Sequence, residues 1–267
     1  MNLSRKQILD EMGLSPQWIL REQPALARED VKAAAPRILP AALPGPKPAL
    51  SVETKASFVE SGPERAQQIA LLGWDELRQS IAACRACGLC AQRKQTVPGV
   101  GDERAGWLFI GEGPGAEEDA RGEPFVGVAG KLLDAMLAAI ELKRGENVYI
   151  ANAVKCRPPG NRTPEAAEMA ACAPYLRRQI ALIEPRLIVL LGRAAVHAVL
   201  GEEGSLASLR GKILSYRDGE KEIPVIVTYH PAYLLRTLPD KAKAWEDLCR
   251  ALALMRQITK EQAAAPG

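Results

Sequence analysis

The chain has 267 residues, of which 47% are hydrophobic and 25% are charged, with a formal net charge of +3 and a pI near 8.5. This size and composition suit one α/β domain with a buried core, and no run of about 18 uncharged apolar residues is present to span a bilayer. The first six residues lead into an acidic amphipathic stretch instead of the apolar segment of a signal peptide, so we expect a cytoplasmic protein that binds no membrane.

The first 63 residues are expected to form a flexible, disordered Ala/Pro-rich extension. Between Ala33 and Pro63, repeated prolines interrupt any helix or strand. Within residues 3–22, apolar side chains recur at helical spacing and favour a short amphipathic helix. That helix is either a frayed, loosely packed segment or a docking peptide for an unidentified protein partner.

A single domain is predicted for residues 64–260, where helices and strands alternate. The expected strands cover residues 107–110, 148–150, 187–191 and 225–228. The expected helices cover residues 64–82, 132–140, 166–183 and 241–257. Because the strands are continuously apolar, they indicate a three-layer α/β/α sandwich around a four-stranded parallel sheet. The buried face of the last helix is expected to carry Trp245, Leu248, Leu252 and Met255.

Polar side chains follow three of these strands at the point where each ends. Glu112, Asn152 and His230 take these places after the first, second and fourth strands. One such loop is an ordinary connection. Ligands bind at the carboxyl edge of open α/β sheets, so three polar residues at equivalent places predict a binding site there.

Four cysteines form a second constellation: a CxxC pair at Cys84 and Cys87, followed by Cys156 and Cys172. In a cytosolic protein, clustered cysteines more often hold metal or perform chemistry than form disulfides. Four thiolates suit either an iron–sulfur cluster or a tetrahedral zinc ion, and spacing alone does not separate the two.

Five ordered segments carry a family resemblance. They are CRAC at Cys84–Cys87, GEGPGAEED at Gly111–Asp119, GEPFVGVAGKLLD at Gly122–Asp134, YIANAVKCRPP at Tyr149–Pro159 and HPAYLLR at His230–Arg236. Over about residues 78–255, the chain resembles the iron–sulfur uracil-DNA glycosylases of family four, within the uracil-DNA glycosylase superfamily. The resemblance implies a monomeric base-excision repair enzyme that flips uracil out of DNA and hydrolyses its N-glycosidic bond, leaving an abasic site. No lysine nucleophile, and therefore no strand-cleaving step, is implied.

The resemblance also implies a cofactor, a [4Fe–4S] cluster bound by Cys84, Cys87, Cys156 and Cys172, with a structural role beside the DNA. The remaining cysteines, Cys90 and Cys249, are expected to be free thiols.

Around the base, the resemblance places Gly113, Phe125, Asn152 and His230. Uracil presents a donor at N3 and an acceptor at O4, whereas cytosine presents the reverse, so the Asn152 amide can match one and reject the other. Phe125 is expected to stack on the extruded base, with core packing as its alternative. His230 is expected to stabilise the departing uracil anion as a neutral donor. The other histidine, His197, is interpreted as a packed or surface side chain.

Two positions depart from the family pattern. Better-known relatives carry a water-activating aspartate where this chain has Gly113, so we expect Glu112, or secondly Glu118, to take that role. The alternative for Glu118 is a solvated acidic helix start. Gly115 replaces the aromatic residue that excludes thymine elsewhere, and Glu118 is the candidate substitute.

DNA contact is expected from two loops. Tyr233, Leu234 and Leu235 follow His230 and have the apolar character of a wedge that fills the space left by the base, with Arg236 on a phosphate. Arg157 and Arg162 lie in a rigid basic loop beside a cluster ligand and suit backbone contact.

Two rival functions stay open at this point. One is a non-catalytic iron–sulfur protein that binds DNA or senses damage, which the glycine at position 113 favours and Asn152, Phe125 and His230 disfavour. The other is a small redox protein, which has no use for the HPAYLLR segment. The histidine-bearing insertion of covalently DNA-trapping relatives is absent after the second strand.

Overall fold

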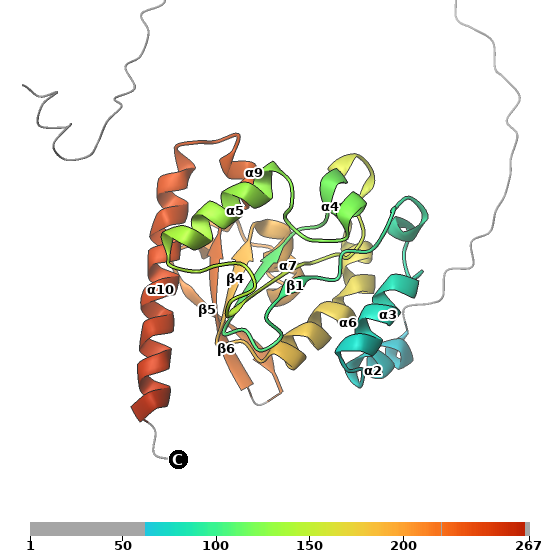
Figure 1. Ribbon diagram of the computed structural model, residues 1–267, viewed down its shortest axis with the longest axis horizontal. Helices are drawn as coiled ribbons and strands as arrows, with labels where there is room; N and C mark the ends of the chain where they lie inside the picture. The colour runs from blue at the N-terminus through green and yellow to red at the C-terminus, as the bar shows by residue number, and fades with distance from the viewer. Residues whose placement is uncertain (1–61, 220, 265–267) are drawn as a thin grey trace, which may run out of the picture. The chain divides into compact units, whose positions relative to one another are not determined.

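The computed structural model describes residues 62–219 and 221–264 (Figure 1). The extension predicted for residues 1–63 therefore lies outside the described residues except for its last two positions, and so does the helix expected at 3–22. Within the described ranges, no helix combines the length and apolarity needed to cross a membrane.

A six-stranded sheet with the strand order β1-β3-β2-β4-β6-β5 forms the centre of the domain. Its strands are β1 (Val100–Gly101), β2 (Trp107–Gly111), β3 (Val148–Asn152), β4 (Leu187–Leu191), β5 (Ile213–Asp218) and β6 (Lys221–Thr228). The four neighbours β3, β2, β4 and β6 are parallel, which confirms the predicted parallel core. The predicted strand count is wrong at both edges, where β1 pairs antiparallel to β3 and β5 pairs antiparallel to β6.

The edge strands lack the signal that identified the others. All residues of β2, β3 and β4 are buried, so each reads as a continuous apolar run. β1 has only two residues, and along β5 exposed residues such as Ile213 and Ser215 alternate with partly buried ones such as Leu214 and Tyr216. A half-exposed edge strand shows this alternation in place of an apolar run.

Helices surround the sheet. They are α2 (Pro63–Ala70), α3 (Trp74–Ala83), α4 (Ala116–Arg121), α5 (Val128–Ala139), α6 (Ala166–Ile183), α7 (Arg193–Leu200), α8 (Leu206–Leu209), α9 (Pro231–Leu234) and α10 (Asp240–Ala264), with the 3-10 turns η1 (Gly88–Ala91) and η2 (Pro159–Asn161). α6 begins and ends at the predicted residues. The helix predicted for 64–82 is instead two helices, because α2 ends at Ala70 and Gly73 serves as the N-cap of α3, where it donates to the Glu76 carboxylate.

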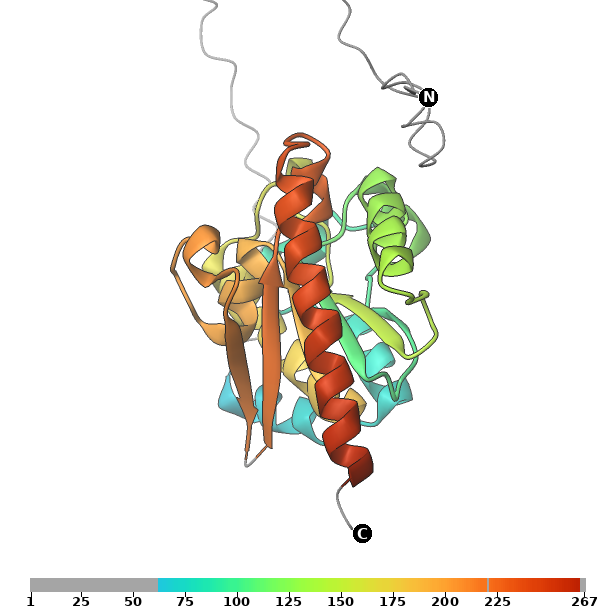
Figure 2. The ribbon, with the colours of Figure 1, turned by 90° about the vertical axis from the view of Figure 1, so that its left-hand side faces the viewer.

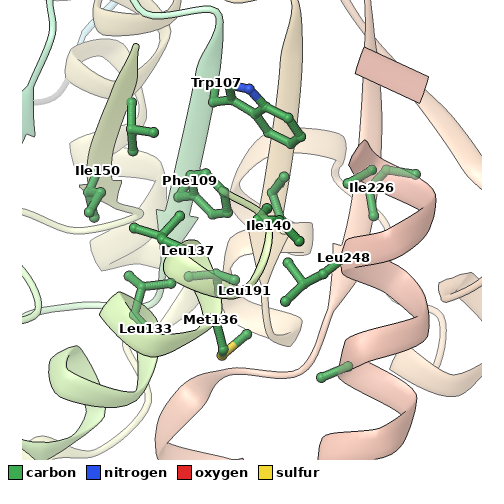
Figure 3. Packing of buried hydrophobic residues seen from close by; sticks show 14 of the residues in the cluster. Trp107, Phe109, Leu133, Met136, Leu137, Ile140, Ile150, Leu191, Ile226 and Leu248 are labelled. Carbon is green, nitrogen blue, oxygen red and sulfur yellow. The ribbon is translucent and has the colours of Figure 1, made fainter. Parts of the chain in front are cut away.

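Two apolar layers, one on each face of the sheet, confirm the three-layer sandwich. Successive strand residues point to opposite faces, so Trp107 and Phe109 of β2 join a cluster with α5 and α10, whereas Leu108 and Ile110 join a cluster with α6 and α7. Figure 3 shows the first cluster, in which side chains of α5 and α10 meet those of the strands. Figure 2 shows α10 crossing that face of the sheet.

The prediction for the buried face of α10 is wrong at Trp245, which is 47% exposed. The buried stripe runs through Ala244, Leu248, Ala251 and Met255, at alternating spacings of four and three residues. Trp245 lies one position beyond the start of that stripe and therefore turns towards solvent.

Candidate active site

An open cavity of about 760 Å³ lies at the carboxyl ends of the parallel strands. The predicted site residues that line it are Glu112, Gly113, Glu118, Phe125, Asn152, Arg162, His230, Tyr233 and Arg236. The structure thus brings together segments separated by more than a hundred residues, at the sheet edge that the sequence indicated.

Asn152 is the last residue of β3 and lines this cavity. Its side chain is 2% exposed, and Oδ1 has no hydrogen-bond partner among the described residues. A buried amide oxygen without a donor is costly, so its position favours a ligand that supplies an N–H. Gly111 is the register partner of Asn152 on the neighbouring strand. Its lack of a side chain leaves room for the Asn152 amide, since a Cβ at position 111 would lie 2.5 Å from Asn152 Oδ1.

His230 follows β6 and presents a neutral donor to the cavity. Its Nδ1 accepts a hydrogen bond from the Ala232 backbone N–H at 3.2 Å, which assigns the ring proton to Nε2. Nε2 is buried and without a partner among the described residues. Burial and the nearby positive charge of Arg236 lower the pKa of His230 to about 4, while Glu118 opposes this shift. The imidazole is therefore neutral at physiological pH, as expected from the sequence.

Phe125 lies against His230, with ring centroids 5.4 Å apart and planes at 30°. Its backbone takes a positive φ of 56°, and Arg144 holds this turn by donating to the carbonyls of Pro124 and Phe125 at 2.8 Å. Close packing requires a glycine at position 130, because a Cβ there would lie 1.7 Å from the Phe125 carbonyl oxygen. Phe125 joins the core, as its alternative interpretation expected, and it also lines the cavity. Its stacking on a base stays a prediction.

The two candidate carboxylates differ in their surroundings. Glu118 caps the start of α4: one carboxylate oxygen accepts from the Val126 and Gly127 N–H groups at 2.9 and 3.0 Å, and the other accepts from Gly115 N–H at 3.0 Å. Glu112 lines the cavity, and its side chain makes no hydrogen bond or ion pair within the described part of the chain. Glu112 is therefore available to a ligand, while Glu118 is engaged in fixing the loop that carries Phe125.

The predicted DNA-contact residues differ in their surroundings: one arginine is exposed, two arginines are engaged by neighbouring side chains, and the tyrosine is stacked. Arg236 is exposed at the cavity rim, whereas the Arg162 guanidinium is paired with both oxygens of Glu168 at 2.7 and 2.8 Å. Arg157 donates to Asn161 Oδ1 at 2.8 Å. Tyr233 stacks on Tyr229 with centroids 5.0 Å apart.

The prediction of Leu234 as a wedge is wrong. Leu234 is 1% exposed and belongs to the core, because it lies one turn after Pro231 on the face of α9 that packs towards α5. Leu235 and Leu238, 38% and 60% exposed, are the apolar side chains that this segment presents to solvent.

The sequence interpretation missed the loop after β4. Gly192 and Arg193 line the cavity, as does Tyr229. The signal was present, since Gly192 follows an apolar strand as Gly111 does. With a φ of +91°, Gly192 passes so close to His230 that a Cβ would lie 3.0 Å from the His230 Cβ.

A second, small cavity is lined by Cys84, Cys87, Cys156 and Cys172. Cys84 follows α3, Cys87 precedes η1, Cys156 lies in the loop after β3 and Cys172 lies in α6. The structure therefore brings the four predicted ligands together. Cys90 also lines this cavity, whereas Cys249 is exposed on α10.

Hydrogen-bond donors reach three of these sulfurs, and two of the donors are arginines. Arg93 donates to Cys156 Sγ at 3.0 Å, Arg65 donates to Cys84 Sγ at 3.5 Å, and the Lys155 backbone N–H donates to Cys172 Sγ at 3.3 Å. Burial raises the pKa of Cys172 to about 12 and that of Cys156 to about 11. Thiolates at these positions therefore need a compensating positive charge. Among the described residues, no three His, Cys, Asp or Glu side chains are grouped closely enough to hold a single ion.

Comparison with known proteins gives a consistent assignment. Residues 98–249 match the family model of the uracil DNA glycosylase superfamily. A type-4 uracil-DNA glycosylase of Archaeoglobus fulgidus is 46% identical over 165 residues, covering 60% of this chain and 82% of the relative. A type-4 enzyme of Thermotoga maritima is 41% identical over 182 residues, covering 67% and 93%, and a type-5 enzyme of Thermus thermophilus is 36% identical over 158 residues, covering 47% and 71%. The chain therefore belongs to the uracil DNA glycosylase superfamily, among its type-4 members.

Proposed function

We propose that the protein is a monofunctional uracil-DNA glycosylase of base excision repair, a monomer that acts on DNA in the cytoplasm. The observation that carries the proposal is that two buried polar atoms of this cavity, Asn152 Oδ1 and His230 Nε2, have no hydrogen-bond partner among the described residues. One is an acceptor and the other a donor, as the N3–H and O2 of uracil require. A protein partner for residues 3–22 remains part of the proposal.

The proposed mechanism begins with extrusion of the base, since the glycosidic bond is out of reach inside the stack. Phe125 stacks on the base and Asn152 pairs with its N3–H and O4. As the bond between N1 and C1′ breaks, negative charge develops on uracil, and the His230 Nε2–H stabilises it at O2. Water oriented by Glu112 adds its oxygen to C1′, and its proton ends on the leaving base or in solvent.

The direct test is a single-turnover assay with oligonucleotides that carry one uracil, in single-stranded and double-stranded form. Alkali should cleave the strand at the abasic site only after incubation with the holoprotein. Matched oligonucleotides with cytosine or thymine are the controls. A holoprotein that binds uracil-containing DNA without forming abasic sites would favour the non-catalytic DNA-binding alternative.

We also propose that Cys84, Cys87, Cys156 and Cys172 bind a [4Fe–4S] cluster. The donor set fits, since four cysteine side chains line one cavity and cysteine thiolates are the usual ligands of such a cluster. When bound, the cluster supplies a covalent cross-link between the segment after α3, the loop after β3 and helix α6. The residues of this chain that support it are Arg93 and Arg65, whose N–H groups reach ligand sulfurs.

Glu112 and Glu118 should respond differently to replacement of the carboxylate by an amide. Glu112→Gln should lower the single-turnover excision rate about a hundredfold and leave DNA affinity unchanged, because it removes a water-orienting charge that holds no part of the fold. Glu118→Gln should lower the melting temperature, because the side chain accepts three backbone N–H groups. Excision rates and thermal melts of both variants check this, and a Glu118 variant that melts normally but is inactive would move the water-orienting role to Glu118.

Asn152→Asp should lose uracil excision by about tenfold or more, because an ionised carboxylate offers only acceptors where uracil O4 needs a donor. The same change should raise the relative activity on cytosine, whose edge presents the complementary donor. Excision from matched uracil and cytosine oligonucleotides measures both effects. Retention of the original uracil rate would remove Asn152 from base recognition.

Arg236→Ala should weaken DNA binding and reduce its salt dependence by about one phosphate contact, since the side chain is exposed at the cavity rim. Arg217→Ala is the matched control, because Arg217 is exposed on β5 outside the cavity lining. Affinities measured over a range of salt concentrations give both slopes. Equal slopes for the two variants would place Arg236 away from the phosphates.

A further inference from the structure

A buried lysine lies between the two cavities. Lys155 is 1% exposed and ranks among the largest fully buried side chains of the described residues. It belongs to the short loop that connects Asn152, at the end of β3, to Cys156, and it lines the cysteine cavity. A fully buried lysine is rare in proteins, because its ammonium loses its hydration.

Lys155 contacts both sites. Its Nζ donates to the main-chain carbonyl oxygen of Asn152 at 2.8 Å. Its backbone N–H donates to Cys172 Sγ at 3.3 Å, and its carbonyl accepts from Val97 N–H at 2.8 Å. Three hydrogen bonds therefore fix the residue, and two of them lead to a base-recognition residue and a proposed cluster ligand.

Among the described residues no carboxylate forms an ion pair with the Lys155 ammonium, whereas the cavity that it lines carries the cysteine sulfurs. The sulfurs of Cys156 and Cys172 line the same cavity as Lys155, and Cys172 Sγ accepts the Lys155 backbone N–H. A cluster held by four thiolates is negatively charged as a whole, and a buried cation beside it offsets part of that charge. A fully buried position of this kind normally holds an apolar side chain. A cluster in this cavity would explain why a lysine occupies it.

We propose that Lys155 is a positioning residue that couples the cluster to base recognition. Its ammonium compensates the charge of the cluster and at the same time clamps the backbone of Asn152, which keeps the Asn152 amide in register with the edge of uracil. The inference rests on the proposed function and adds that the two sites share one cation. Cluster charge and uracil discrimination should therefore change together when that cation is removed.

The test uses holoprotein of Lys155→Met, which keeps the volume of the side chain and removes its charge and donor. One measurement is the reduction potential of the cluster by spectroelectrochemical titration, which should become more negative than in the unmodified protein. The other is the affinity for DNA carrying non-cleavable 2′-fluoro-2′-deoxyuridine relative to the same DNA carrying thymidine. That ratio should fall about tenfold, the scale of one lost buried hydrogen bond to a charged group. Lys260→Met removes an exposed lysine of α10 and should change neither quantity.

Lys155→Gln separates the two roles, because it keeps a donor for Asn152 and lacks the charge. It should recover part of the uracil preference and keep the shifted potential. An unchanged potential in Lys155→Met overturns the coupling, and so does an unchanged uracil preference. If neither variant retains iron, Lys155 serves assembly of the cluster and the coupling is also overturned. Failure of the unmodified holoprotein to excise uracil would instead overturn the proposed function, so the two failures are distinguishable.

Discussion

His230→Ala is expected to lower the single-turnover rate of uracil excision by about a hundredfold or more, with little change in affinity for DNA. The Nε2–H of His230 is buried in the cavity, and Ala232 N–H fixes the ring by donating to Nδ1. A preorganised donor of this kind acts on charge that appears only as the glycosidic bond breaks, so its loss affects the transition state more than binding.

The matched control is His197→Ala. His197 is partly buried in α7 and does not belong to the cavity lining, so its removal should leave both rate and affinity near their original values. Equal rates for the two histidine variants would show that uracil departs without help from His230.

The pH dependence follows from the same geometry. Burial lowers the pKa of His230 from 6.5 to about 4, so the ring should not gain a proton between pH 8 and 5 and the excision rate should not fall through that histidine in this range. The unfolded chain binds that proton near pH 6.5, so this group also contributes stability that is present above 6.5 and is lost as pH falls towards about 4. A rate that halves near pH 6.5 would show a solvated histidine instead.

Much of the fold could be predicted from the sequence, because its parallel strands are buried on both faces. β2, β3 and β4 are buried along their whole length, and Pro164 and Glu165 before α6 marked its start at Ala166. The edge strands could not be predicted from the sequence, since β1 has two residues and β5 alternates between exposed and partly buried positions. A run of apolar residues marks a strand that is buried on both faces. An edge strand is only partly buried, so its sequence lacks such a run.

The candidate site was predictable in position and less so in detail. Asn152 lies at the carboxyl end of one strand and His230 just beyond the end of another, so the sequence pattern predicted both at the ligand-binding edge of the sheet. The tautomer of His230 was not readable, because it depends on the turn that brings Ala232 N–H to Nδ1. The capping role of Glu118 had a signal in its spacing from Gly115, the pattern of a capping box, but its bonds to Val126 and Gly127 depend on a loop eight residues further along.

For the four cysteines, the sequence predicted the ligands but not the charged side chains around them. Their positions in the chain identified a set of ligands, while the surrounding cations, Arg65 and Arg93, come from segments that no motif connects to them. The charged residues around a buried site are neighbours in three dimensions and not in the sequence, so no sequence motif predicts them.

Cys156→Ala is expected to abolish the brown colour of the purified protein, reduce its iron from about four atoms per chain and lower its melting temperature by about 10 °C or more. Cys156 is buried where α3, the loop after β3 and α6 meet, so removing one ligand breaks the cross-link among all three and leaves the Arg93 guanidinium without its sulfur partner. Cys249→Ala trims an exposed side chain of α10 and should shift melting by no more than about 2 °C, with iron unchanged. Iron analysis and thermal melts of both variants, prepared without oxygen, make the comparison. One zinc per chain in colourless, anaerobically prepared protein, or equal melting temperatures for the two variants, would contradict the assignment of these cysteines to an iron–sulfur cluster.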